Sequence, residues 1–117
     1  MNKILLGFMV VILLTIQVEA KENKQKYKNY AYNLVVNKYH WKEKDYNNLV
    51  KLWTKESNWR VKAQNGKYYG ICQTKKSNYG SKYNDYKTQI KWGLKYIKRR
   101  YGNPTNAWKH WKKYHWY

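Results

Sequence analysis

Acidic residues are scarce in this chain of 117 residues, in which 6 Asp and Glu stand against 25 Lys and Arg. The formal net charge is therefore +19 at neutral pH. An excess of one sign on this scale indicates a polyanionic neighbour, because the summed field of the cations attracts such a partner. The charge by itself leaves the type of polyanion open.

Cysteine is almost absent as well, because Cys72 stands alone and cannot form an internal disulfide. His110 and His115 have neither a metal-ligand spacing nor a Cys cluster beside them, so the sequence predicts no metal and no cofactor. Cys72 with a histidine would suit a cysteine peptidase or amidase. A reactive thiol needs a helix N-terminus or an adjacent cation, however, and Cys72 is expected at the edge of a hairpin.

No apolar run reaches the roughly 20 residues that a membrane-spanning helix needs. The longest run, Ile4 to Ile16, follows Lys3 and precedes Val18-Glu19-Ala20, which has residues suited to a cleavage site. We therefore expect residues 1–20 to be a signal peptide. An uncleaved N-terminal anchor and a buried helix are the alternatives.

Export follows from that reading, with the periplasm, the cell wall or the medium as the destination. Residues 21–117 are then one small domain, expected to be a monomer, in which residues 21–28 form a frayed basic tail. The domain has only eleven Leu, Ile and Val. Trp and Tyr must therefore supply much of its core, although each has a polar group that requires a partner.

Helical spacing of apolar residues predicts a mainly α fold of the α+β class, with four or so helices and a small β-hairpin. The expected helices are a segment from residue 27 that ends at Tyr39-His40-Trp41, a second whose apolar stripe covers residues 46–56, a third over residues 86–101 and a last short one that begins at Asn103-Pro104. Gly102 is expected to end the third of them. Asn65-Gly66 predicts the tight turn of the hairpin.

Glu56 continues the apolar stripe of the second helix, which turns its carboxylate toward the interior or a cleft. Trp53 and Trp59 flank it in the sequence, and desolvation by such rings would favour the neutral acid. Lys55 and Arg60 oppose this effect. The sequence does not show which of these opposing effects on the protonation of Glu56 is larger.

A carboxylic acid is what cleavage of a glycosidic bond requires, usually with a second carboxylate roughly 5–10 Å away. The other acids of the domain lie in unsuitable places: the tail, the start of the second helix and the N-cap of the third. They are Glu22, Glu43, Asp45 and Asp85. The sequence therefore favours a single-acid mechanism in which the substrate supplies the second group.

Three short blocks occur in a characteristic order: Glu56-Ser57, Gly70-Ile71-x-Gln73 and Ile90-x-x-Gly93-x-x-Tyr96-Ile97. Together they resemble the soluble lytic transglycosylase family, which shares the fold of goose-type lysozyme. The resemblance covers residues 46–117 and is to a small exported or phage-associated branch. It implies a lysozyme-like fold.

The activity implied by the resemblance is cleavage of the β-1,4 bond between N-acetylmuramic acid and N-acetylglucosamine in peptidoglycan. Glu56 would protonate the glycosidic oxygen and then act as base on the muramyl 6-hydroxyl, which closes a 1,6-anhydro ring. The alternative is hydrolysis, as by a muramidase, which gives a hydrated product. The partner would be the glycan strand.

The resemblance also implies substrate contacts around Glu56. Ser57 and Gln73 would contact the sugar or hold the acid in place, while Tyr69 and Gly70 would line the cleft. The remaining expected contacts are Ile71, Tyr96 and Trp108. The Ala-Tyr-Asn motif of the family is replaced here by Ala107-Trp108-Lys109. The missing Asn changes the hydrogen bonding expected on the wall of the cleft that this motif forms.

A non-catalytic role explains the composition equally well. The charge and the Trp and Tyr content would suit a binder of anionic wall polymer or of a membrane surface. Single-stranded nucleic acid also binds basic surfaces with interleaved aromatics, but export argues against it, and no specific nucleic acid is expected as a partner.

Overall fold

The computed structural model describes the backbone of residues 2–117 and the side chains of residues 12–117. It is mainly helical with a small antiparallel sheet, as the sequence predicts. The elements in chain order are α1 (Asn2–Asn33), the π-helix η1 (Leu34–Lys38), α2 (Glu43–Ser57), β1 (Gln64–Asn65), β2 (Tyr68–Tyr69), β3 (Thr74–Lys75), the 3-10 helix η2 (Lys76–Lys82), α3 (Tyr86–Tyr101) and α4 (Pro104–Tyr114).

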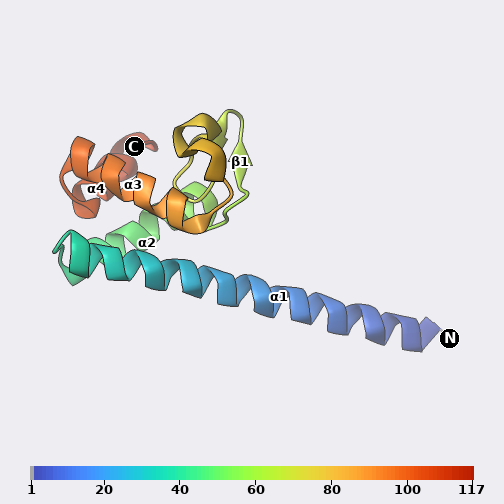
Figure 1. Ribbon diagram of the computed structural model, residues 1–117. Coiled ribbons are helices and arrows are strands. Elements are labelled where there is room, and N and C mark those ends of the chain that lie inside the picture. Colours follow the sequence, from blue (N-terminus) through green and yellow to red (C-terminus); the bar gives the residue numbers. More distant parts are fainter. Residues whose placement is uncertain (1) are drawn as a thin grey trace.

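Helix α1 extends well beyond the remaining elements, which gather around its C-terminal half (Figure 1). Its exposed apolar side chains include Leu13 and Leu14. Among the helices that the structure describes, none is both long and apolar enough to cross a membrane. The predicted signal peptide, residues 1–20, lies partly outside the described side chains and stays a prediction.

The frayed tail expected at residues 21–28 is wrong, because these residues belong to α1. Tyr27 packs on Tyr86 of α3 with 4.8 Å between ring centroids, and Tyr30 meets the same ring edge-on at 5.6 Å. Lys26 lies over that ring as well. The charges of this segment predicted a frayed tail, whereas its aromatic rings hold the helix against the domain.

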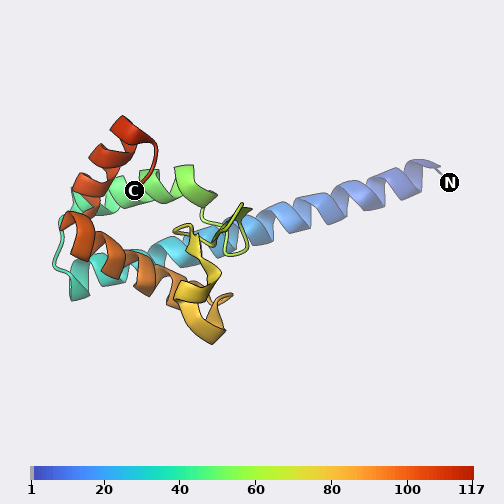
Figure 2. The same ribbon diagram turned by 90° about the horizontal axis from the view of Figure 1, so that it is seen from above.

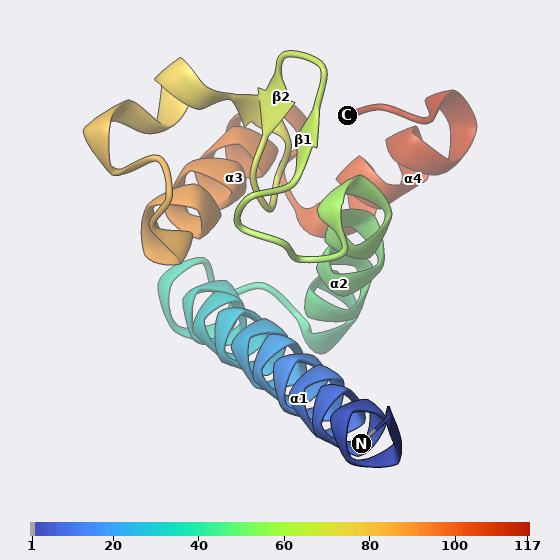
Figure 3. The ribbon, with the colours of Figure 1, turned by 90° about the vertical axis from the view of Figure 1, so that its right-hand side faces the viewer.

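Helices α2, α3 and α4 surround the core at the C-terminal end of α1 (Figures 2 and 3). Trp53 and Trp59 are its largest side chains and meet edge to face, with centroids 5.1 Å apart. Leu49 and Trp53 of the predicted stripe are fully buried, and Tyr46 and Val50 are partly buried against the core. The core therefore does depend on aromatic rings, as the composition predicts.

The helix boundaries follow local capping. The Asp85 side chain accepts a hydrogen bond from the Thr88 backbone N–H at 3.0 Å and so caps α3. Gly102 ends that helix with φ of 86°, a conformation that favours glycine. Asn103 then caps α4, in which Pro104 is the first residue. These boundaries confirm the predicted ones.

The predicted hairpin at Asn65-Gly66 is present, but it belongs to a three-stranded antiparallel sheet in the order β1-β2-β3. The third strand pairs Tyr69 with Thr74. Each strand has two residues. Strands this short give no alternating pattern in the sequence, so β3 was not expected.

Gln89 connects α3 to the loops on both sides of the sheet. It is fully buried, its Oε1 accepts from the Ile71 backbone N–H at 2.8 Å, and its Nε2 donates to the carbonyl oxygens of Val61 at 2.9 Å and Tyr83 at 2.6 Å. A Cβ at Gly70 would lie 2.6 Å from Gln89 Oε1. Glycine is therefore needed where the loop crosses this amide.

Replacing Gln89 by alanine should lower the free energy of unfolding by about 2–4 kcal/mol, because it leaves one buried and two partly buried backbone groups without this partner. Chemical denaturation measures the change. The matched control is Lys91→Ala, at an exposed position of the same helix, which should change stability by less than about 0.5 kcal/mol. Equal effects of the two substitutions would contradict the proposed role of Gln89.

Candidate active site

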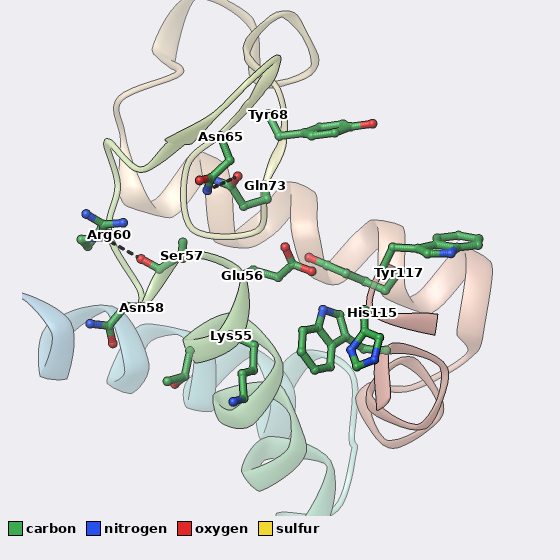
Figure 4. A pocket seen from close by; sticks show the side chains of 13 residues that line it. Lys55, Glu56, Ser57, Asn58, Arg60, Asn65, Tyr68, Gln73, His115 and Tyr117 are labelled. Carbon is green, nitrogen blue, oxygen red and sulfur yellow. Dashed lines mark hydrogen bonds between the residues drawn. The ribbon is translucent and has the colours of Figure 1, made fainter. Parts of the chain in front are cut away.

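A cleft of about 710 Å³ lies between the end of α2, the β1–β2 hairpin and the C-terminal part of the chain (Figure 4). Its lining is mostly polar or aromatic. The residues that line it are Thr54, Lys55, Glu56, Ser57, Asn58, Arg60, Asn65, Tyr68, Gln73, Trp111, His115, Trp116 and Tyr117. The cleft therefore combines one acidic side chain, Glu56, with the cations Lys55 and Arg60 and several aromatic rings.

Glu56 lies in the last turn of α2, and its carboxylate points into the cleft toward Tyr117 (Figure 4). Burial raises the pKa of this carboxyl from 4.5 to about 7. A hydrogen bond from the Trp111 side chain acts in the opposite direction but does not cancel the effect. Desolvation therefore decides the balance that the sequence left open.

Trp53 and Trp59 do not shield Glu56, although their places beside it in the sequence predicted that they would. Both indoles are in the core, where Trp59 Nε1 donates to the Val50 carbonyl oxygen at 3.3 Å. Asn58 and Trp59 have φ of 53° and 57°, and these two left-handed residues turn the chain back so that the indoles meet. The indole beside the acid is that of Trp111.

Ser57 and Gln73 both hold the loops around the acid. Ser57 Oγ is buried and lies 2.6 Å from the Ile71 carbonyl oxygen, which fastens the end of α2 to the loop after β2. Gln73 Nε2 donates to the carbonyl oxygens of Ala63 at 3.0 Å and Gly70 at 2.9 Å. Of the two expected roles, the contacts favour holding the acid in place.

Three other expected contacts lie behind the cleft rather than in it. Tyr69 is buried and donates its hydroxyl to Asn84, Gly70 is buried against Gln89, and Ile71 is a fully buried core residue. These three residues shape the loop, and the side chains of Tyr69 and Ile71 are buried. None of the three is among the residues that line the cleft.

Tyr96 and Trp108 lie beside the cleft. Tyr96 lines a smaller pocket that shares Tyr117 with it. Trp108 stacks on Trp111 with centroids 5.5 Å apart and an interplanar angle of 9°. It therefore supports the ring that contacts Glu56 and does not itself line the cleft.

The C-terminal segment contributes functional residues that sequence reasoning missed. His115 ends α4 with φ of 62°, and the residues after it turn back to line the cleft. Tyr117 is fixed there because its hydroxyl accepts from Trp53 Nε1 at 2.9 Å and donates to the Cys72 carbonyl oxygen at 2.7 Å. The aromatic residues after α4 were a signal, but their return toward α2 depends on tertiary contacts.

The remaining acids are used elsewhere. Asp45 accepts from the Lys42 backbone N–H at 3.0 Å and from the Thr105 hydroxyl, Asp85 caps α3, and Glu43 accepts from a tyrosine hydroxyl. Among the described residues that line the cleft, Glu56 is the one with a carboxylate side chain. The part of the chain with described side chains also contains no group of three or more His, Cys, Asp or Glu that could hold a metal ion.

Cys72 is buried, and burial raises the pKa of its thiol to about 12. The thiolate, which is the nucleophilic form, is therefore unfavourable near neutral pH. Its Sγ lies 3.1 Å from the Tyr79 hydroxyl, inside the core. These contacts speak against a cysteine peptidase or amidase.

Comparison with known proteins adds no relative: no protein-family model, no curated protein and no solved structure matches the chain. The resemblance to soluble lytic transglycosylases therefore stays a prediction based on the three motifs.

Burial of Glu56 should make stability depend on pH. The folded protein binds the proton more tightly than the unfolded chain, so stability falls as the pH rises from 4.5 to about 7. Glu56→Gln should match the parent protein at pH 4 and exceed it by about 1–2 kcal/mol at pH 8, after allowance for solvent around this half-buried group. Thermal unfolding at both pH values measures the difference.

The control for this experiment is Glu22→Gln, which removes the same charge from an exposed position on α1. It should give no gain that is specific to pH 8. A gain from Glu56→Gln that is equal at pH 4 and pH 8 would contradict the proposed cost of burying the carboxylate.

Proposed function

We propose that the protein cleaves the β-1,4 bond between N-acetylmuramic acid and N-acetylglucosamine in peptidoglycan, with Glu56 as its acid and base. The observation that carries the proposal is a half-buried carboxyl whose pKa is raised to about 7, in a cleft lined by no second carboxylate side chain among the described residues. Such a group is available both as acid and as base near neutral pH.

The first step uses the protonated carboxyl. Glu56 donates its proton to the glycosidic oxygen, the bond to the muramyl C1 breaks, and the N-acetylglucosamine fragment leaves with a new hydroxyl. The carboxylate that remains carries a negative charge beside the positively charged sugar centre. The hydrogen bond with the Trp111 side chain favours this charged state.

The second step uses the carboxylate as base. It accepts the proton of the muramyl 6-hydroxyl, whose oxygen attacks C1 and closes a 1,6-anhydro ring. Glu56 is then protonated again, and no water is consumed. The absence of a second acid among the residues lining the cleft favours this route, because hydrolysis usually employs one to activate water. A hydrated product would require another group to position that water.

A second candidate is a non-catalytic binder of anionic wall polymer or membrane. The observation in its favour is the charge of +19, together with Lys55 and Arg60 in the lining of the cleft. Binding of this kind should weaken steeply as salt is added. It does not require an acid with a raised pKa.

Glu56→Gln should reduce lysis of purified peptidoglycan by roughly a thousandfold, because the amide cannot donate or accept the proton. Mass spectrometry of the released muropeptides should show products of the parent protein that are one water lighter than hydrolytic ones. Glu22→Gln is the matched control and should lyse normally. Equal lysis by Glu56→Gln would overturn the proposal, and absence of lysis by the parent protein would favour the non-catalytic binder.

The pH profile gives an independent test. Activity should fall above about pH 7, as Glu56 loses its proton. Trp111→Phe removes a hydrogen bond that favours the carboxylate, so the pKa should rise and the alkaline limb of kcat/KM should move up by roughly half a unit to one unit. Trp108→Phe keeps an aromatic ring against Trp111 and leaves the hydrogen bond to Glu56 intact, so the limb should stay in place. A limb that moves down in Trp111→Phe would contradict the assignment.

A further inference from the structure

The Glu56 cleft does not end at Tyr117. It shares Tyr68, Gln73 and Tyr117 with a smaller pocket of about 170 Å³, and that pocket continues to Trp92 and Tyr96 on α3. The shared residues place the two hollows next to each other, and we call this pair, which extends from the acid to the face of α3, the track.

A third hollow follows on the far side of these two rings. It is an open depression of about 430 Å³ lined by Trp92, Lys95, Tyr96, Lys98 and Arg99. No carboxylate side chain lines this depression or the smaller pocket among the described residues. We call the five residues of this depression the α3 platform.

The helical repeat explains how the α3 platform is formed. Trp92, Lys95, Tyr96 and Arg99 follow the i, i+3, i+4, i+7 pattern and therefore lie on one face of α3, with Lys98 beside them. The two rings are nearly parallel, with centroids 5.4 Å apart and an interplanar angle of 11°. The three cationic side chains are exposed.

The rings are also fixed in position. Trp92 meets Tyr79 edge-on at 6.0 Å, and the Tyr96 hydroxyl donates to the main-chain oxygen of Tyr117 at 3.0 Å. Tyr96 therefore couples the platform directly to the residue that Glu56 faces. A rigid aromatic surface loses little freedom when it binds, which favours a ligand with a flat apolar face.

Aromatic faces beside cations suit a saccharide that carries negative charge. The rings can stack on the apolar face of a sugar, and the ammonium and guanidinium groups can donate charge-assisted hydrogen bonds to a carboxylate. Muramic acid residues of peptidoglycan carry a carboxylate on the free lactyl group or, where that group is amidated, on the attached peptide. Continuity with the Glu56 cleft favours the same strand that is cleaved there.

We propose that the α3 platform is an accessory binding site for the continuation of the glycan strand, in which a carboxylate-bearing substituent lies against Lys95, Lys98 and Arg99. This inference rests on the proposed function of the Glu56 cleft. It adds a preference for carboxylate-bearing glycan over neutral N-acetylglucosamine oligomers.

The test measures binding without turnover, in the full-length Glu56→Gln protein. In that background, Lys95→Gln, Lys98→Gln and Arg99→Gln are combined as the platform variant. The control variant combines Lys44→Gln, Lys51→Gln and Lys109→Gln, which remove the same charge from exposed positions outside the track. The ligands are soluble peptide-bearing peptidoglycan strands, neutral N-acetylglucosamine oligomers and a polyphosphate wall polymer.

The platform variant should bind peptide-bearing strands about tenfold more weakly, the loss expected from three exposed charge contacts, and the control variant less than twofold more weakly. Both should bind the neutral oligomers equally well. Equal losses in the two variants would overturn the proposal, because net charge alone would then explain binding. A loss larger for the polyphosphate than for the glycan would overturn it too. Failure of the proposed function appears separately, as absence of muropeptide products from the parent protein.

Discussion

The fastening of the end of α2 to the loop after β2 is the constraint on which the site depends. Ser57 Oγ contacts the Ile71 carbonyl oxygen at 2.6 Å, and the Ile71 N–H is in turn held by Gln89 of α3 at 2.8 Å. These two buried contacts fix Ser57, the residue next to Glu56 at the end of α2, relative to the loop after β2 and to α3. Without them, the carboxylate would stand at the end of a helix in open solvent, with its ordinary pKa.

Buried polar contacts also explain how a domain with few aliphatic residues holds its shape. The Trp53 indole N–H is satisfied by the Tyr117 hydroxyl, which itself donates to the Cys72 carbonyl oxygen. Each ring thus supplies apolar area and a hydrogen bond at once. The same chain of contacts that fills the core also places Tyr117 opposite Glu56, so that packing and site geometry are inseparable in this protein.

Attraction of a polyanion and protonation of Glu56 depend on different parts of the protein. The exposed Lys and Arg side chains give a field that attracts a polyanion over the whole surface, whereas the pKa of Glu56 is set locally by burial. Solvent screens exposed cations but not the desolvation of a carboxyl inside a cleft. A strongly basic protein can therefore keep one acid protonated near neutral pH. Burial of this carboxyl lowers the stability of the fold as the pH rises from 4.5 to about 7, as is common for functional groups.

Helix positions, their caps and the turn at Asn65-Gly66 were available from the sequence, because each depends on a residue and its near neighbours. Asp85, Gly102 and Asn103 act within one turn of helix. Glu56 was also identifiable, since helical periodicity alone turned it toward a cleft. The helical state of residues 21–28 was missed because it depends on Tyr27 meeting Tyr86, far along the chain.

The rest of the site was decided by tertiary structure. Two left-handed residues after α2 directed Trp59 into the core, and the turn after α4 brought Tyr117 to the acid. The resemblance suggested sugar contacts at Tyr69, Gly70 and Ile71, but these three residues are buried in the loop behind the cleft. A sequence pattern fixes which face of one helix is apolar, but only the packing of several elements determines which ring, hydroxyl or loop reaches a given carboxylate.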